Sequence, residues 1–487
     1  MIRHHFGTSL VSAVLLAVVA NSGREATAIT AEQLDRHDLV DAVFARWDKP
    51  DTPGCALGVI QDGELIYQQG YGMANLDWDI PITPETVFYV GSVSKQFAAA
   101  AVALLAQDGT LSLDDDIRKY FPEMPTYEKQ VTIRHLIHHT GGIRDIYTLM
   151  SLAGLRIEDV FPDDDAVTLI AGQQETNFTP GDEYLYSNSD YFLLAELFER
   201  AADTTLREYG EERIFGPLGM TDTHFHDQSD HVLKRRAMSY GVNPLAAAEE
   251  RFVITYLGNF NKVGAGGLYT TIRDLLLWDR NFYSGKVGGQ NLLDQIHTRG
   301  VLSNGQELDY AFGLILGDYR GLRTVGHDGS MMGFRATYLQ FPEQRFSVAI
   351  ACNLGNISPG VLARQVADLY LADSFTAPRG RRREGGRSQA AGRRQETMEI
   401  DTAALEAYTG VYDSEELGVS YELFLDGDAL TVTMPNRAPF TLQPVRVDVF
   451  RGPWAFMFER DAADAVTAFR VNAGRVTNIR FVRRARD

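Results

Sequence analysis

Hydrophobic and polar residues follow two different patterns along this chain. Between residues 31 and 373, strand-like and helical runs alternate without a repeat. This block opens on a predicted hairpin in which QDG joins CALGVI to LIYQQGYG, and a second predicted hairpin, ATYLQFPEQRFSVAIAC, lies near its end. Strands at both ends with helices between them predict one antiparallel sheet, completed by the two ends of the block, with flanking helices and a helical subdomain.

From residue 400 to residue 487 the pattern changes to a period of two. The run YELFLDGDALTVTM predicts a hairpin around Asp426-Gly427, and the later alternating runs have another turn signal at residues 472–474. Roughly eighty residues of antiparallel sheet are enough for a small barrel. The predicted fold class is therefore α+β with a small C-terminal antiparallel β-barrel, and this last block carries no cluster of candidate catalytic groups.

An arginine-rich segment separates the two blocks. Residues 374–398 hold seven arginines between Arg379 and Arg394, set among glycine, serine and alanine with no large apolar residue. Such a composition cannot bury enough surface to order itself, which favours a flexible linker. A basic tract that contacts an anionic surface is the alternative.

The first 28 residues have the layout of a secretory signal peptide. A short basic start at Arg3 precedes the apolar run from Leu10 to Ala20, and the small residues Ala26 and Ala28 offer a cleavage site. The apolar run is about half the length that a membrane span needs, and no other stretch is long and apolar enough. The pattern predicts a periplasmic or secreted protein that does not span the membrane. A buried N-terminal helix or an uncleaved anchor is the alternative.

Charge and cysteine content exclude several classes of protein. The 487 residues carry a formal net charge of -19, which argues against nucleic acid as the main partner because a phosphate backbone repels such a surface. Two cysteines are too few for a disulfide scaffold or for most cysteine-based metal sites. Export would permit a disulfide between Cys55 and Cys352, but their strand-like surroundings favour two buried thiols that act as small hydrophobes.

The helix predicted to begin near Ser92 contains an unusual lysine. Its body, AAAAVALLA, is apolar on every side and should be buried, yet Lys95 lies in its first turn. A buried ammonium must be paired, or its pKa must fall. Ser92 lies three residues earlier on the same helix face, where a desolvated amine could take the proton of its hydroxyl. The pattern alone leaves open the alternative of a helix-capping serine and a surface lysine.

Two further motifs could contribute polar groups to the same chemistry. Tyr186 and Asn188 lie on a predicted loop that leads into a helix, where a tyrosine could relay protons and an amide could hold a substrate carbonyl. His327 lies between Gly326 and Gly329 beside a predicted strand, and these glycines would let backbone approach a ligand. Each of these two motifs alone is more typical of a structural role: a core tyrosine with a helix cap, and a turn histidine.

Taken together and in this order, the three motifs resemble the serine β-lactamase and penicillin-binding-protein superfamily. The resemblance is strongest to the branch of class C β-lactamases, D-stereospecific aminopeptidases, DD-carboxypeptidases and related esterases. It covers roughly residues 38–370 and rests on the blocks GYGMANLDWDIPITPETVFYVGSVSKQF, DGTLSLDDDIRKYFPEMP, VTIRHLIHHTGGI, FTPGDEYLYSN, GAGGLYTTIRDLLLW and GHDGSMMGF. It implies a β-lactamase/transpeptidase-like domain over residues 31–373.

The resemblance also implies roles for particular residues. Ser92 would be the acylated nucleophile and Lys95 its proton-accepting partner. Tyr186 would relay protons to the leaving group or from water, and Asn188 would contact the substrate amide. The backbone N–H groups of Ser92 and Ser330 would form the oxyanion hole. No metal or cofactor is implied.

The His327 motif departs from the pattern of many relatives. Where β-lactamases and penicillin-binding proteins often have Lys-Thr/Ser-Gly, this chain has His327-Asp328-Gly329. Histidine carries a positive charge only part of the time, which weakens the case for a β-lactam or a free C-terminal carboxylate as substrate. His327 and Gly329 are therefore expected to bind substrate in the manner of the aminopeptidase-like and esterase-like members.

The sequence thus predicts an exported serine hydrolase that acts through an acyl-enzyme on Ser92 and cleaves a peptide, amide or ester bond of a peptide or small molecule. A true β-lactamase and a non-catalytic binding protein of the same fold are the alternatives. The C-terminal block resembles the lipocalin-like barrels of some peptidases in this superfamily, which shape substrate access or oligomerisation. A passive stability module is an equal alternative for it, and the sequence does not indicate the oligomeric state.

Overall fold

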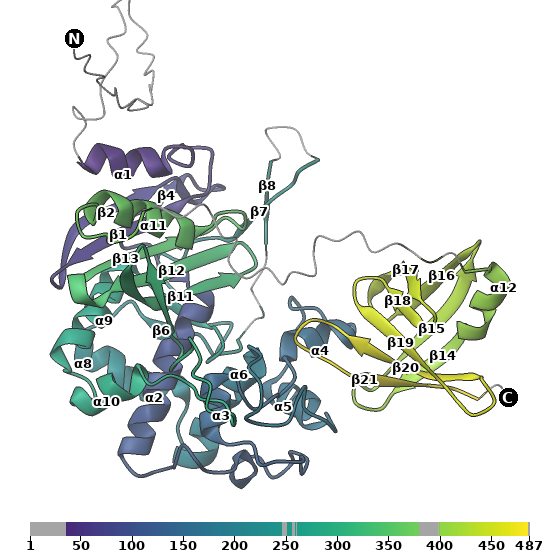
Figure 1. Cartoon of the computed structure of the whole chain (residues 1–487). Helices are drawn as coiled ribbons and strands as arrows, with labels where there is room; N and C mark the ends of the chain where they lie inside the picture. Colours follow the sequence, from purple (N-terminus) through teal and green to yellow (C-terminus); the bar gives the residue numbers. More distant parts are fainter. Residues whose placement is uncertain are drawn as a thin grey trace, which may run out of the picture.

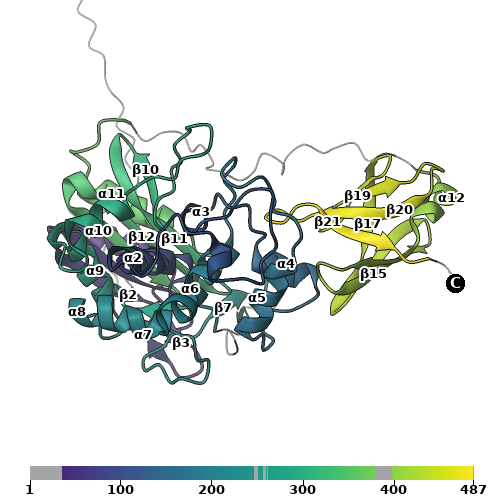
Figure 2. The same cartoon turned by 90° about the horizontal axis from the view of Figure 1, so that it is seen from below.

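The computed structural model describes residues 36–245, 251–255, 259, 261–378, 398 and 400–485 of the chain. The predicted signal peptide (1–28) and most of the predicted linker (374–398) lie outside the described residues. The described part consists of a mixed α/β body and a closed barrel at one end of the molecule (Figures 1 and 2). No helix within it combines the length and apolar character that a membrane crossing requires.

The body is built on a six-stranded antiparallel sheet in the order β10-β11-β12-β13-β1-β2. Its strands are β1 (Cys55–Gln61), β2 (Glu64–Tyr71), β10 (Ile315–Tyr319), β11 (Leu322–Met331), β12 (Phe334–Phe341) and β13 (Phe346–Cys352). Both predicted hairpins are present, β1–β2 and β12–β13, and they join because β1 pairs with β13. The sheet is therefore completed by the two ends of the block, as the sequence predicted.

Helices cover both faces of this sheet. On one face α1 and α11 pack against the alternate β1 residues Leu57 and Val59, while Ala56 points into the larger core on the other face. The helices of the body are α1 (Arg36–Phe44), α2 (Lys95–Gln107), α3 (Ile133–His138), α4 (Ile146–Leu152), α5 (Asp163–Ala171), α6 (Asn188–Ala202), α7 (Leu206–Gly210), α8 (Gly216–Leu218), α9 (Ile272–Ser284), α10 (Gly289–Ile296) and α11 (Pro359–Tyr370). Its short strands are β3 (Met73–Asn75), β4 (Ile80–Pro81), β5 (Phe88–Tyr89), β6 (His224–Phe225), β7 (Tyr240–Val242), β8 (Phe252–Ile254) and β9 (Leu268–Thr270).

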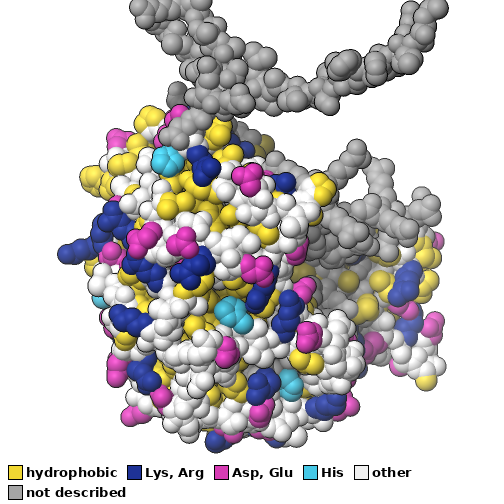
Figure 3. All heavy atoms as spheres, turned by 60° about the vertical axis from the view of Figure 1, so that its left-hand side comes forward, with side chains coloured by type: hydrophobic (Ala, Val, Ile, Leu, Met, Phe, Trp, Pro, Cys, Tyr) yellow, Lys and Arg dark blue, Asp and Glu magenta, His cyan; other side chains and the backbone are white. Residues whose placement is uncertain are grey.

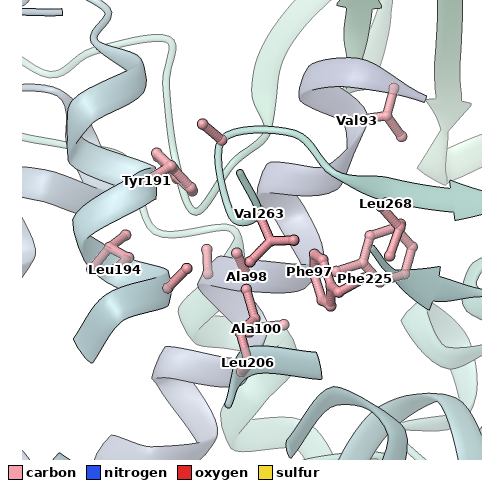
Figure 4. Close-up of a cluster of buried hydrophobic side chains, with 14 of the residues drawn as sticks. Val93, Phe97, Ala98, Ala100, Tyr191, Leu194, Leu206, Phe225, Val263 and Leu268 are labelled. Carbon is pink, nitrogen blue, oxygen red and sulfur yellow. The ribbon is translucent and has the colours of Figure 1, made fainter. Parts of the chain in front are cut away.

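Helix α2 lies at the centre of the larger core. Every residue from Lys95 to Leu105 is buried, which confirms the prediction made from its uniformly apolar body. Figure 4 shows Phe97 of α2 beside Phe225 of β6, and Ala100 near Leu206 of α7. Because α2 is packed on all sides, the side chains of its first turn are held in fixed positions.

The two cysteines form a disulfide, so the interpretation as two free buried thiols is wrong. Cys55 begins β1 and Cys352 ends β13, and the two residues lie directly opposite each other in the antiparallel pair. Such opposed positions bring their side chains within bonding reach. The local surroundings of each cysteine could not reveal this, because the pairing depends on the register of strands far apart in the sequence.

The C-terminal block is a closed antiparallel barrel, as predicted. Its eight strands are β14 (Gly410–Ser414), β15 (Val419–Asp426), β16 (Ala429–Met434), β17 (Arg437–Arg446), β18 (Val449–Arg451), β19 (Ala455–Arg460), β20 (Val466–Asn472) and β21 (Ile479–Arg483), preceded by the short helix α12 (Thr402–Leu405). Buried aromatic side chains gather inside it, among them Tyr412, Tyr421, Phe456, Phe469 and Phe481.

The barrel is attached to the body through both apolar and charged contacts. Leu149 and Leu152 of α4 belong to the barrel's apolar cluster. Arg144, wholly buried, pairs with Glu416 of the β14–β15 loop at 2.7 Å, and Tyr421 donates a hydrogen bond to the carbonyl of Leu152 at 2.6 Å. A charge buried this completely depends on its partner, so the ion pair restricts how the barrel can sit on the body.

The disulfide should contribute measurably to stability, because it closes a long loop of the unfolded chain. We expect the variant with both Cys55→Ala and Cys352→Ala to lose about 2–5 kcal/mol of unfolding free energy in a urea titration. Dithiothreitol should destabilise the parent protein and leave the double variant unchanged. Equal urea midpoints for oxidised parent and variant would contradict the assignment.

The buried ion pair gives a second test. Glu416→Gln leaves the buried Arg144 guanidinium with only the more distant carboxylate of Glu175, at 4.0 Å, which should cost about 3–5 kcal/mol in thermal unfolding. Glu422→Gln, an exposed position on β15, is the matched control and should change stability little. If both variants melt at the parent temperature, the Arg144 charge does not depend on Glu416.

Candidate active site

Ser92 lies in the short 3₁₀ turn Gly91–Ser94 that joins β5 to α2. Gly91 has a φ of 55°, in the left-handed region, and a Cβ at this position would lie 2.5 Å from the backbone nitrogen of Ser330. Only glycine therefore fits before the serine. The tight turn leaves Ser92 partly exposed in a cavity, while the helix behind it is fully buried.

The Lys95 amine lies 3.3 Å from Ser92 Oγ. It also lies 3.0 Å from Asn188 Oδ1 and 2.6 Å from the carbonyl oxygen of Ala265. Burial, the largest influence, lowers the pKa of Lys95 well below its ordinary value of 10.5. A neutral amine has two N–H groups for these two carbonyl oxygens and one lone pair for the Ser92 hydroxyl. The geometry thus suits a base for Ser92.

Tyr186 lies beside the same pair. The Lys95 amine is 4.8 Å from the centre of the Tyr186 ring. Burial raises the pKa of Tyr186, and its contact with the Ser92 side chain partly offsets this rise. The tyrosine is therefore a neutral proton donor near pH 7, close to the serine and the lysine.

Asn188, the first residue of α6, is held by an aspartate that the sequence analysis did not single out. Its backbone N–H and its side-chain amide both donate to Asp145 Oδ2 at 2.8 Å, while its Oδ1 faces Lys95. One side-chain N–H remains for a substrate carbonyl. Asp145 also accepts a hydrogen bond from the backbone of Thr148 at the start of α4, so from sequence it looks only like a helix cap.

A buried histidine–aspartate pair lies beside Tyr186. His139 Nδ1 is 2.7 Å from Asp190 Oδ2 and also accepts a hydrogen bond from the backbone N–H of Ser187. Burial lowers the pKa of His139 well below its ordinary value and raises that of Asp190 well above its own. The His139 ring lies 4.4 Å from the Tyr186 ring, centre to centre, so the pair packs directly against the tyrosine.

His327 is buried on β11 and does not carry charge near neutral pH. Its Nδ1 donates to the carbonyl oxygen of Asp328 at 2.6 Å, and its Nε2 lies 3.4 Å from the hydroxyl of Tyr310. Burial lowers the pKa of His327 to about 4. A substrate carboxylate therefore finds no positive charge at this position.

Strand β11 runs directly past the Ser92 turn. A Cβ on Gly329 would lie 1.9 Å from the carbonyl oxygen of Val90 and 3.1 Å from the backbone nitrogen of Ser92. Only glycine permits this approach of strand to turn. It brings the backbone at Ser330 beside the nucleophile's own backbone, where the predicted oxyanion hole would need its two N–H groups.

These residues surround one cavity of about 730 Å³. The structure brings all the predicted site residues together, with Lys95 beneath the floor and the others in the lining, namely Ser92, Tyr186, Asn188, His327, Gly329 and Ser330. The lining also includes Arg475 from the barrel, which the sequence analysis missed. Among the described residues, no group of three or more histidine, cysteine or acidic side chains is placed to hold a metal ion.

Comparison with known proteins identifies the family of the body. Residues 39–372 match the family model described as beta-lactamase. The chain is 29% identical over 301 residues to a D-aminopeptidase of Gluconobacter oxydans, covering 62% of this chain and 56% of that protein. It is 28% identical over 329 residues to a D-aminopeptidase of Brucella anthropi, covering 65% and 61%. The chain thus spans less than two thirds of the length of either relative.

Solved structures share the fold. The octameric penicillin-binding protein homologue from Pyrococcus abyssi superimposes with a TM-score of 0.60 at 22% identity, over 92% of this chain and all of that one. The D-amino acid amidase from Ochrobactrum anthropi SV3, complexed with D-phenylalanine, does so with a TM-score of 0.58 at 20% identity, over 70% of this chain and all of that one.

The buried amine predicts a pH dependence of stability. Because the pKa of Lys95 is lower in the folded protein than in the unfolded chain, the unfolded state binds the extra proton, and stability should rise with pH between the two values. The slope from this one group is at most about 1.4 kcal/mol per pH unit. We expect Lys95→Met to remove this rise in urea titrations between pH 6 and pH 9. The exposed, ion-paired Lys119, changed to Met, should keep the parent slope, and parallel curves for parent and Lys95→Met would contradict the neutral amine.

Proposed function

Because the chain belongs to the beta-lactamase family, we propose that it is a serine hydrolase that works through an acyl-enzyme on Ser92. The observation that carries the proposal is the 3.3 Å contact between Ser92 Oγ and the amine of a wholly buried lysine, Lys95. A serine hydroxyl alone is a poor nucleophile, and a neutral amine at this distance is the base it needs. A binding protein that had lost turnover would have no use for this complete set.

Acylation follows from the positions of these groups. As Ser92 Oγ attacks the substrate carbonyl, its proton passes to Lys95, and the carbonyl oxygen becomes an oxyanion between the backbone N–H groups of Ser92 and Ser330. The tetrahedral intermediate then collapses, and the leaving nitrogen or oxygen takes a proton from Tyr186, which is restored from Lys95. Water attacks the resulting ester in the second half, its proton returns along the same route, and Ser92 is released.

At His327 the site departs from the pattern of many β-lactamases. His327 is neutral, so the permanent charge that a lysine would supply beside Gly329 is missing. The two relatives are named D-aminopeptidase, which makes D-amino-acid amides and peptides the first substrates to test.

We also propose that the protein works outside the cytoplasm, in the periplasm or beyond the cell. The first 28 residues read as a cleavable signal peptide. The disulfide between Cys55 and Cys352 supports this, because such bonds persist in oxidising compartments.

Covalent labelling tests the nucleophile. With a fluorophosphonate probe, the parent protein should gain one adduct in intact-mass measurement, mapped to Ser92, and Ser92→Ala should gain none. Hydrolysis by Ser92→Ala should fall at least about a thousandfold, because the covalent route is lost. Ser112→Ala, an exposed serine outside the cavity, is the matched control. Labelling of Ser92→Ala at the parent rate would contradict the assignment.

Assays of the parent protein with a D-alanine anilide, a matching ester and a penicillin distinguish an amide or ester hydrolase from a β-lactamase and from a binding protein. Turnover of the anilide or the ester without the penicillin supports the proposal. Rapid penicillin hydrolysis would indicate a β-lactamase, and no adduct with any reagent would indicate a binding protein.

A further inference from the structure

We propose that Arg475, brought into the active site by the barrel, selects substrates that carry a carboxylate within a few atoms of the scissile bond. The inference deepens the proposed function and rests on it for the identity of the cleaved bond. It starts from a residue of the barrel that lines the same cavity as Ser92.

The loop between β20 and β21 is anchored to the body at Arg475 itself and at Thr477. The carbonyl oxygen of Arg475 accepts hydrogen bonds from the backbone N–H of Asp145 at 3.4 Å and from the side chain of Asn177 at 2.9 Å. The backbone N–H of Thr477 donates to Asn177 Oδ1 at 2.8 Å. Figure 1 shows this end of the barrel directed at α4. The backbone of the loop, and not the guanidinium, therefore holds the loop in place.

The Arg475 side chain reaches over the catalytic groups. Its guanidinium lies 4.7 Å from the centre of the Tyr186 ring, and the Lys95 amine lies 4.8 Å from the same centre. The positive charge of Arg475 also helps to lower the pKa of Lys95, which shows how closely the two groups are associated.

The Arg475 guanidinium has hydrogen-bond donors that can bind a ligand. Its ion pair with Asp145 is long, 3.7 Å, and the same Asp145 oxygen already accepts two hydrogen bonds at 2.8 Å from Asn188. The Arg475 side chain is 46% exposed, and within the described residues its five N–H groups donate no hydrogen bond of ordinary geometry. A planar carboxylate matches this open donor array.

The remainder of the cavity lining is also positive. Arg335 of β12 and Arg364 of α11 line it, and no carboxylate of the described residues lies within ion-pair distance of either. The lining contains one acidic side chain, Asp328. On the face that Figure 3 shows, acidic and basic side chains are instead intermixed, and the whole chain has a net charge of -19. The positive charge in the cavity is thus a local feature.

Arg475 therefore supplies the permanent charge that His327 lacks, and supplies it from another part of the chain. Of two substrates with the same scissile bond, the one that carries a carboxylate gains a charge-assisted contact beside Tyr186. The predicted class is a carboxylate-bearing ester or amide.

Two esters that differ only in charge test this inference. These are the 4-nitrophenyl monoester of adipic acid and its neutral twin, in which the free carboxylate is a methyl ester. The quantity to measure is the ratio of kcat/KM for the anionic ester to that for the neutral ester. Arg475→Met should lower this ratio about 10- to 100-fold, because it removes one charge-assisted contact. Arg475→Lys should retain most of it.

The control is Arg480→Met, in the adjacent β21, whose arginine pairs with Glu459 and lies outside the cavity. This variant should keep the parent ratio. An equal fall in kcat/KM for both esters in Arg475→Met, or an unchanged ratio, would overturn the inference, since a merely structural role does not distinguish charge.

A binding measurement keeps the inference separate from the proposed function. Adipate should bind Ser92→Ala in isothermal calorimetry, and binding should weaken at least about tenfold when Arg475→Met is added. No adipate binding to Ser92→Ala would overturn the inference. Adipate binding without any fluorophosphonate adduct on the parent protein would support the anion site and contradict the acyl-enzyme.

Discussion

The arrangement of the candidate site depends on the burial of one amine, that of Lys95. Lys95 lies on a helix that is enclosed on every side, and its amine has no access to water. Burial disfavours a charged ammonium there and lowers the pKa of Lys95. The amine has two carbonyl partners, Asn188 Oδ1 and the carbonyl oxygen of Ala265. The same burial that encloses α2 therefore also sets the properties of the amine beside Ser92, which is the base in the proposed function.

The contacts of Lys95 lead outward to the barrel. Asn188 faces Lys95 on one side and Asp145 on the other, and Asp145 begins α4. Helix α4 contributes Leu149 and Leu152 to the barrel's apolar cluster, while the backbone of Asp145 binds that of Arg475. A shift of the barrel would thus reach the Lys95 amine through Arg475, Asp145 and Asn188. This continuity favours a barrel that shapes the site over a passive stability module.

The sequence predicted well those features that depend on local pattern. The apolar residues around Lys95 predicted a buried helix. The turn signal before Asn188 predicted a loop that leads into a helix, and the glycines beside His327 predicted a close approach of the backbone. The order of the three motifs along the chain predicted the fold. No local pattern in the sequence predicted three other features: the disulfide, the Arg144–Glu416 pair and the place of Arg475 in the cavity. Each depends on a partner far along the chain, so its role is set by strand register or by how the barrel is placed. Arg475 in particular follows a predicted turn, where an arginine is ordinarily a solvated surface residue.

Arg475 has two electrostatic effects in the cavity that could oppose each other: it attracts an anionic substrate, and it lowers the pKa of Lys95. Arg475 helps to keep Lys95 unprotonated, and an anion bound to Arg475 would weaken that influence. Burial, however, is the largest cause of the lowered pKa of Lys95, and it does not depend on the barrel. Under the proposed function, a charge from the barrel can therefore recognise a negative substrate while burial in the core lowers the pKa of Lys95. Substrate preference could then change through the β20–β21 loop without disturbing α2.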